Sequence, residues 1–210
     1  MKNIAEILVQ HDIVKTNFKE PFVWASGIKS PIYCDCRELI SLPEARKEIN
    51  QAFLDLISRE NLPHDIISGT ATAGIAWAAF IAQDLDKPML YVRPEPKSHG
   101  AGKQVEGRGE KGKKVLIIED AFSTGGSSIK SAEALRNELD ADVENILAIF
   151  SWDTPQLKVN AEKGKVNMLP LTNFAEIAEA LEKFGKISDK ESEELMRFHS
   201  DPKNWWDTKS

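Results

Sequence analysis

Two adjacent carboxylates, followed by a loop of hydroxyls and glycines, are the residues of this chain best suited to chemistry. The aliphatic run 115–118 leads directly to Glu119 and Asp120, and the next residues are Ala121, Phe122, Ser123, Thr124, Gly125, Gly126 and Ser127. The two glycines allow the backbone to turn tightly and to approach a ligand without a Cβ in the way. Backbone N–H groups, hydroxyls and the N-terminus of a following helix would converge on one anion. We therefore predict a site for a phosphate monoester between this strand and its helix.

Glu119 and Asp120 need a partner other than the phosphate, because two carboxylates beside a phosphate would repel it. Vicinal sugar hydroxyls, or a magnesium ion held together with them, are suitable partners. The arrangement therefore predicts a sugar that carries both a 5-phosphate and a vicinal diol. A plainer alternative is a helix capped by Ser123, Thr124 or Ser127, with the two carboxylates as solvated charges at the end of the strand.

A second candidate is the basic, glycine-rich segment between Arg93 and Lys114. It holds seven basic and three acidic residues, about +4 in a chain of formal net charge −6, and five of the chain's twelve glycines. Since the segment has no apolar periodicity, we expect a mobile loop. Its cations could stabilise the negative charge that develops on a leaving group, and its closure would exclude water. The alternative is an ordinary solvated loop.

Alternating strands and helices position both candidates. Periodicity predicts helices near 3–14, from Pro43 onward, and at 75–82, 127–138, 174–184 and 189–198, with buried strands at 65–68, 89–92, 115–118, 145–150 and 166–169. Continuous aliphatic strands separated by helices are typical of a parallel sheet covered on both faces, whose ligands bind beyond the carboxyl ends of the strands. We therefore predict an α/β fold with a twisted parallel sheet flanked by helices, in a single domain over residues 1–210.

Composition argues against several other classes of protein. The formal net charge of −6 and the isoelectric point near 5.4 disfavour non-specific binding to nucleic acid or to anionic membranes. No apolar run approaches the roughly 18 residues that span a bilayer, and the first residues, interrupted by Glu6 and Asp12, do not resemble a signal peptide. Cys34 and Cys36 are too close in sequence for a useful disulfide staple, which fits a reducing compartment. A cytoplasmic protein without nucleic-acid or membrane partners is expected.

The run 115–128 resembles the phosphoribosyl-diphosphate signature of the type I phosphoribosyltransferases. Similarity to one branch, the orotate phosphoribosyltransferases, extends over most of the chain, and three further blocks carry it: Ala25-Ser26-Gly27-Ile28-Lys29-Ser30-Pro31-Ile32-Tyr33, Gly69-Thr70-Ala71-Thr72-Ala73-Gly74-Ile75, and Val92-Arg93 through Lys97-Ser98-His99-Gly100-Ala101-Gly102. Four blocks in this order are far more specific than the signature alone. The resemblance implies the type I phosphoribosyltransferase fold, with about residues 1–40 as a small hood over the base and about 93–113 as a flexible catalytic lid.

The resemblance also implies an activity and a set of site residues. The enzyme would transfer the 5-phosphoribosyl group from 5-phosphoribosyl 1-diphosphate to orotate, giving orotidine 5′-phosphate and diphosphate in UMP biosynthesis. Lys97, His99 and Asp120 would be catalytic, and orotate would contact Ser123, Lys29 and Tyr33. The donor would be bound by Arg93, Lys97, His99, Glu119, Asp120, Ala121, Phe122, Ser123, Thr124, Gly125, Gly126 and Ser127.

A magnesium cofactor and a homodimer follow from the same resemblance. Mg²⁺ would be held mainly through the substrate, with Glu119 and Asp120 as candidate ligands. In the family, the lid reaches into the site of the neighbouring subunit. The partners implied are therefore the two small-molecule substrates and a second copy of this chain.

Some positions depart from the family pattern. Ala73 and Pro94 replace lysines found in some relatives, Cys34 replaces an aromatic residue, and the stretch 151–154 lacks an arginine that other members place after the fourth strand. These changes leave more of the binding to backbone amides and to the hood. Two alternatives are a purine phosphoribosyltransferase, which would lack the hood, and a non-catalytic regulator that senses phosphoribosyl diphosphate.

Overall fold

A six-stranded sheet forms the centre of the computed structural model, which describes residues 3–24, 27–96 and 102–208. Its strands are β5 (Ile66–Thr70), β6 (Met89–Val92), β7 (Val105–Glu106), β8 (Val115–Phe122), β9 (Asn145–Ser151) and β10 (Asn167–Asn173). Their order is β10-β9-β8-β5-β6-β7, and each neighbouring pair is parallel except β6 and β7. The predicted α/β architecture is confirmed. The antiparallel edge strand β7 was not expected, and β10 runs beyond the predicted 166–169.

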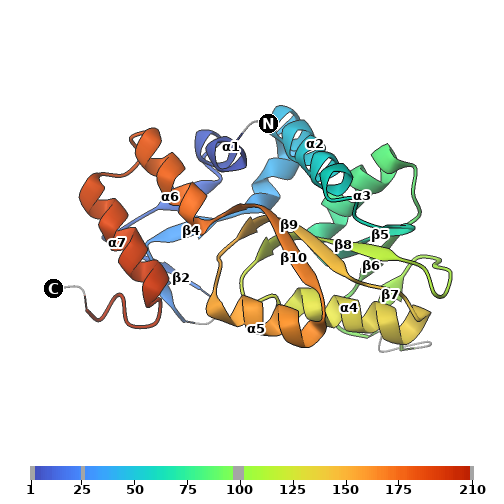
Figure 1. The fold of residues 1–210 in the computed structure, drawn as a ribbon. Helices are drawn as coiled ribbons and strands as arrows, with labels where there is room; N and C mark the ends of the chain where they lie inside the picture. Colours follow the sequence, from blue (N-terminus) through green and yellow to red (C-terminus); the bar gives the residue numbers. More distant parts are fainter. Residues whose placement is uncertain (1–2, 25–26, 97–101, 209–210) are drawn as a thin grey trace.

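Helices cover both faces of this sheet (Figure 1). They are α2 (Pro43–Arg59) and α3 (Gly74–Leu85) on one face, and α4 (Gly126–Leu139) and α5 (Pro155–Gly164) on the other. Side chains of β8 alternate between the two cores: Leu116 and Ile118 pack with residues of α2 and α3, whereas Ile117 packs with residues of α4. A strand buried on both faces is expected to be apolar throughout. The charged end of β8 therefore needs an explanation other than packing.

The N-terminal residues form two small antiparallel pairs of strands outside the central sheet. Their elements are α1 (Ile4–Gln10), β1 (Val14–Thr16), β2 (Phe22–Val23), β3 (Lys29–Ser30), β4 (Ile32–Cys34) and the 3₁₀ helix η1 (Cys36–Ser41). β1 pairs with β4, and β2 pairs with β3. The last helices are α6 (Phe174–Lys183) and α7 (Asp189–Ser200). Helix α6 packs against α1, where the ammonium of Lys183 lies 2.6 Å from a carboxylate oxygen of Glu6.

One local prediction was wrong, and one helix was missed. The helix expected near 3–14 ends at Gln10, because Asp12 adopts a left-handed φ of 53° and Val14 begins β1. Helix α5 was not expected, although Pro155 at its first position and the capping hydroxyl of Thr154 are established start signals. None of the described helices is both long and apolar enough to cross a bilayer.

Candidate functional site

Glu119 and Asp120 lie at the carboxyl end of β8. Glu119 is only 5% exposed, and its Oε2 accepts hydrogen bonds of 3.3 Å from the hydroxyls of Ser127 and Ser128. Burial, together with the charge of Asp120, raises the pKa of Glu119 to about 8. Among the described residues no cation forms an ion pair with either acid. Two acids held this closely form a suitable site for sugar hydroxyls or for a divalent ion.

The loop after β8 leaves the start of α4 open. The helix begins directly after Gly125, which has a φ of 73° and offers no side chain for capping. No hydroxyl of this described loop caps the helix, so the alternative in which Ser123, Thr124 or Ser127 is a cap is wrong. The first N–H groups of a 14-residue helix are therefore available to an anion.

Helix α5 holds the carbonyl groups of the same loop. The hydroxyl of Thr154 donates a hydrogen bond of 2.7 Å to the carbonyl of Ser123. The side-chain amide of Asn160 donates one of 2.7 Å to the carbonyl of Thr124. Ser123 and Thr124 are exposed, whereas Phe122 is fully buried in the core beneath α4. The loop is thus held by the burial of Phe122 in the core and by hydrogen bonds from Thr154 and α5.

A second loop joins β5 to α3 at the same edge of the sheet. Gly74 opens α3 directly against β8, and a Cβ at this position would lie 2.3 Å from the carbonyl oxygen of Ile118. The hydroxyl of Thr70 donates a hydrogen bond of 3.1 Å to that of Ser131 on α4. Helix α3, like α4, starts without a capping side chain. Two open helix N-termini at one sheet edge suit a ligand with more than one phosphate group.

A cavity of about 340 Å³ lies where these elements meet. It brings Arg93 together with Gly126 and Ser127, three of the predicted donor-binding residues. It also contains Lys130, which was not predicted, although it follows Gly126 by one helical turn and so falls on the same face of α4. The lining residues are Thr70, Ala71, Val92, Arg93, Pro94, Glu95, Gly126, Ser127, Lys130 and Ser131.

The described part of the segment 93–113 is attached beside this cavity. Strand β7 pairs with β6, and the side-chain amide of Gln104 donates a hydrogen bond of 3.1 Å to the carbonyl of Arg93. The guanidinium of Arg93 lies 3.5 Å from a carboxylate oxygen of Glu106. Lys97 and His99, two residues expected to be catalytic, lie outside the described residues, as does Ser26.

Two of the three residues expected to bind orotate come from the N-terminal strands, and the third, Ser123, lies in the loop after β8. Lys29 lies on β3, with its ammonium 5.1 Å from the ring centroid of Trp206. The hydroxyl of Tyr33, on β4, accepts a hydrogen bond of 3.2 Å from Arg37 and donates one of 3.4 Å to Asp35. The Arg37 guanidinium lowers the pKa of Asp35. Among the described residues, no hydrogen bond joins Lys29 or Tyr33 to the loop after β8.

Cys36 shows how close the N-terminal region comes to the carboxylates. The Sγ atoms of Cys34 and Cys36 lie 3.7 Å apart, and both cysteines are free. The hydrogen bond with Cys34 and burial raise the pKa of the Cys36 thiol, and the negative charge of Asp120 contributes to the same shift. Helix η1 also packs against β8, so the N-terminal region lies close to the strand that carries the two carboxylates.

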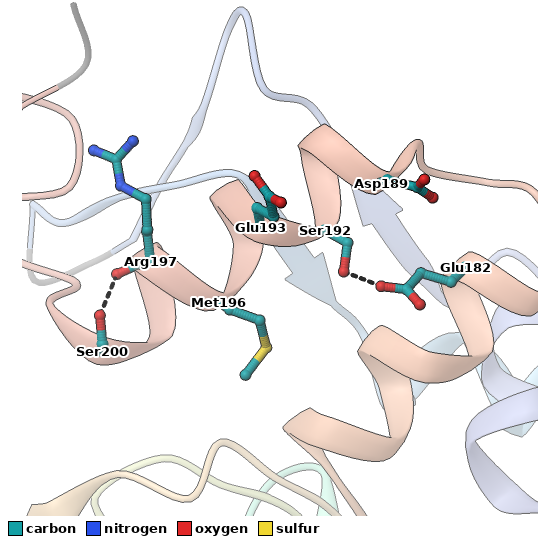
Figure 2. A pocket seen from close by; sticks show the side chains of 7 residues that line it. All are labelled: Glu182, Asp189, Ser192, Glu193, Met196, Arg197 and Ser200. Atoms are coloured by element: carbon teal, nitrogen blue, oxygen red, sulfur yellow. Dashed lines mark hydrogen bonds between the residues drawn. The ribbon is translucent and has the colours of Figure 1, made fainter.

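A larger hollow, of about 570 Å³, lies away from this site on the surface of α6 and α7 (Figure 2). Ser192 donates a hydrogen bond to Glu182, and Ser200 donates one of 2.8 Å to the carbonyl of Arg197. The lining residues all belong to the two helices: Glu182, Asp189, Ser192, Glu193, Met196, Arg197 and Ser200. We assign this hollow no function.

A metal ion would need help from a substrate at this site. Among the described residues, no group of three or more His, Cys, Asp or Glu side chains could hold a metal ion. Glu119 and Asp120 nevertheless provide two carboxylates, which are the protein ligands that Mg²⁺ prefers. The mutual repulsion that raises the pKa of Glu119 would be relieved by a cation. The residues present therefore fit a magnesium ion that takes its other ligands from substrate and water.

Comparison with known proteins identifies relatives over nearly the whole chain. Residues 37–183 match the family model described as the phosphoribosyl transferase domain. The chain is 44% identical over 202 residues to an orotate phosphoribosyltransferase of Coxiella burnetii, with 96% of each chain covered. It is 43% identical over 205 residues to one of Enterococcus faecalis, with 97% of each covered. The crystal structure of orotate phosphoribosyltransferase from Aeropyrum pernix is 31% identical with a TM-score of 0.75, covering 88% of this chain and 99% of that one.

Proposed function

The chain belongs to the phosphoribosyl transferase domain family, and from this membership we propose that it is an enzyme that transfers a 5-phosphoribosyl group from 5-phosphoribosyl 1-diphosphate to orotate. The products are orotidine 5′-phosphate and diphosphate, in the pathway to UMP. The observation that carries this proposal is the identity of 44% and 43% with orotate phosphoribosyltransferases over 96–97% of the chain. The site at the end of β8 agrees with it, because an open helix N-terminus beside two carboxylates suits a sugar phosphate.

The reaction exchanges two bonds at C1 of the ribose. The bond from C1 to the diphosphate oxygen breaks, and a bond from C1 to a ring nitrogen of orotate forms. As this bond forms, the nitrogen loses its N–H proton, which the departing diphosphate can accept, so no strong general base from the protein is needed. Catalysis then depends on positioning the two substrates and on stabilising the charge of the leaving diphosphate.

The proposed roles follow the geometry of the site. The open start of α4, from Ser123 to Ser127, binds the 5-phosphate, and Glu119 and Asp120 bind the ribose hydroxyls. Arg93, in the cavity beside that helix, binds the diphosphate, and Lys130 on the same cavity wall adds a second positive charge. Lys97 and His99 stabilise the leaving group from the lid, as the family resemblance implies.

We propose Mg²⁺ as the cofactor, held with the substrate beside Glu119 and Asp120. When bound, the ion neutralises charge on the diphosphate and so makes it a better leaving group. The two carboxylates orient the ribose whether they contact it directly or share the ion. A titration of donor binding with and without Mg²⁺ tests this assignment, since equal affinities would exclude a role for the ion in binding.

We propose that the enzyme is a homodimer whose lids act across the subunit interface. Mixing a Lys97→Ala chain with an Asp120→Asn chain tests this arrangement, because each parent dimer would be nearly inactive. If the lid serves the neighbouring site, random reassociation restores about a quarter of the wild-type activity, since half of the dimers are mixed and each has one intact site. If the lid serves its own site, no activity returns.

We also propose a cytoplasmic location. The chain has only two cysteines, Cys34 and Cys36, which are too close in sequence for a useful disulfide staple, and this fits a reducing compartment. Fractionation of cells that express the protein, followed by immunodetection in the soluble cytoplasmic and membrane fractions, tests the proposal.

A panel of bases tests the reaction itself. The purified chain is supplied with 5-phosphoribosyl 1-diphosphate and Mg²⁺, and release of diphosphate is measured with orotate, uracil, adenine and guanine. Turnover with orotate alone is expected. Turnover only with a purine would assign the chain to another branch of the family, and donor binding without any turnover would favour a regulator.

A further inference from the structure

The residues after α7 form an ordered turn. The backbone N–H of Trp205 donates a hydrogen bond of 3.1 Å to the carbonyl of Asp201, and that of Thr208 donates one of 3.1 Å to the carbonyl of Asn204. The side-chain amide of Asn204 lies 3.1 and 3.0 Å from the two carboxylate oxygens of Asp201. These bonds join residues within the segment 201–208, which we call the C-terminal turn.

Trp205 anchors the C-terminal turn to the N-terminal strands. The residue is 2% exposed, and its ring centroid lies 5.7 Å from that of Phe198 on α7. The Phe198 ring in turn lies 5.8 Å from the ring of Trp24. Trp24 closes the turn between β2 and β3. Its backbone N–H donates a hydrogen bond of 2.9 Å to the carbonyl of Ile28, and its carbonyl accepts one of 2.8 Å from the N–H of Gly27. In Figure 1, the end of α7 accordingly lies beside β2.

The next residue, Trp206, meets Lys29. The ammonium of Lys29 lies 5.1 Å from the centroid of the Trp206 ring, within the range of a cation–π interaction. Lys29 is exposed on a strand of only two residues, and among the described residues it forms no ion pair with a carboxylate. Both side chains border a cavity of about 360 Å³ lined by Gly27, Ile28, Lys29, Lys203, Trp206 and Asp207.

We infer that Trp206 is a positioning residue, which holds the ammonium of Lys29 in place to bind orotate. The inference rests on the proposed function. An exposed lysine loses much side-chain freedom when it binds a ligand, and contact with the ring face reduces that cost in advance. A carboxylate partner would hold the ammonium equally well, but it would cancel the positive charge that an anionic base requires. The indole ring is neutral, so the charge and the N–H donors stay available.

Three variants at position 206 distinguish a role of the aromatic ring face from a role of the side chain in packing. Trp206→Leu removes the ring but keeps an apolar side chain, Trp206→Phe keeps a ring, and Trp206→Met serves in place of the leucine variant if circular dichroism shows that variant unfolded. In the leucine or methionine variant we expect the KM for orotate to rise about threefold to tenfold. The KM for the donor and kcat should stay within about twofold, and the phenylalanine variant should keep most of the wild-type affinity.

A second lysine–aromatic pair provides a matched control. The ammonium of Lys183 lies 5.9 Å from the ring centroid of Phe184, at the C-terminal end of α6. Phe184→Leu therefore removes the aromatic partner of a lysine that has no proposed role in binding orotate, and it should leave the KM for orotate unchanged. An equal rise in that KM would show that the effect of position 206 is not local.

A double-mutant cycle with Lys29→Met decides the mechanism. If Trp206 acts through Lys29, Trp206→Leu has no further effect on the KM for orotate once the lysine is gone. Additive effects, or a leucine variant with wild-type KM, would overturn the inference. Both results require a wild-type enzyme that turns over orotate, so failure of the proposed function would appear separately, as absence of activity in the wild-type chain.

Discussion

The side-chain amide of Asn160 donates a hydrogen bond of 2.7 Å to the backbone carbonyl of Thr124. This bond links α5 to the loop that begins the proposed phosphate site. In a trans peptide, the C=O and N–H groups point in opposite directions. A carbonyl fixed toward α5 therefore directs the N–H of Gly125 away from α5. The hydrogen bond thus orients the loop before any ligand arrives.

We predict that Asn160→Leu weakens binding of the phosphoribosyl donor without unfolding the protein. Loss of one hydrogen bond of about 1 kcal/mol would raise the Kd for the donor roughly fivefold. Isothermal titration of the donor into each variant measures this change. Val159→Ala, at the exposed neighbouring position of α5, is the control and should bind as the wild type does. Equal affinities for all three proteins would show that the loop needs no support from α5.

Gly74→Ala should destabilise the fold. The added Cβ would lie 2.3 Å from the carbonyl oxygen of Ile118, and neither backbone can yield easily because both belong to the central elements α3 and β8. We expect the free energy of unfolding to fall by about 3 kcal/mol, measured by urea denaturation. Gly126→Ala is the matched control for stability, since its Cβ would have only the hydroxyl of Thr124 nearby, at 3.7 Å. A similar loss in both variants would contradict the steric argument.

The sequence predicted the sheet well because its signal is local. The run 115–118 is apolar throughout, and β8 is indeed buried on both faces. The turn between β8 and α4 was predictable for the same reason, since Gly125 and Gly126 lie within four residues of the end of the strand. Helix α5 was missed because few of its residues are apolar and only Leu157 and Gly164 are buried.

The supports of the site depend on contacts between distant residues, which periodicity does not reveal. Asn160 lies 36 residues from Thr124, and Thr154 lies 31 residues from Ser123. The contact between Lys29 and Trp206 joins the two ends of the chain. Lys130 was closer to being predictable, because it shares a helix face with Gly126.

Lys97→Ala should lower turnover strongly while the fold persists. The family resemblance implies that this lysine contacts the leaving diphosphate. One such donor stabilises a transition state by about 3 kcal/mol, which corresponds to roughly a hundredfold in kcat. Steady-state assays and thermal unfolding of the same preparations check both parts. Lys87→Ala, an exposed position in the turn before β6, controls for the loss of a positive charge. Near-normal turnover of the Lys97 variant would remove the lid from the mechanism.

Glu119→Gln should change how stability depends on pH. In the folded, ligand-free enzyme, burial and the charge of Asp120 raise the pKa of Glu119 to about 8, from an ordinary value of 4.5. Between these values the folded state binds more protons than the unfolded state, so this group's contribution to stability falls as pH rises. The contribution is fully present below pH 4.5 and is lost as pH approaches and passes 8. A glutamine stays neutral at every pH and carries no such dependence.

The effect is measured by urea denaturation of the wild type and of Glu119→Gln at pH 5, 7 and 9. The free energies of unfolding of the two proteins are subtracted at each pH, so that the contributions of the other titrating groups cancel. The glutamine variant should gain stability relative to the wild type as the pH rises, by at most about 5 kcal/mol over this range. Saturating donor and Mg²⁺ should reduce the difference at pH 9, because hydroxyls or a cation beside Glu119 stabilise its charged form, which the glutamine cannot provide. A constant difference between the two proteins at all three pH values would mean that the pKa of Glu119 is not raised in the free enzyme. Glu119 would then be ionised before any ligand binds.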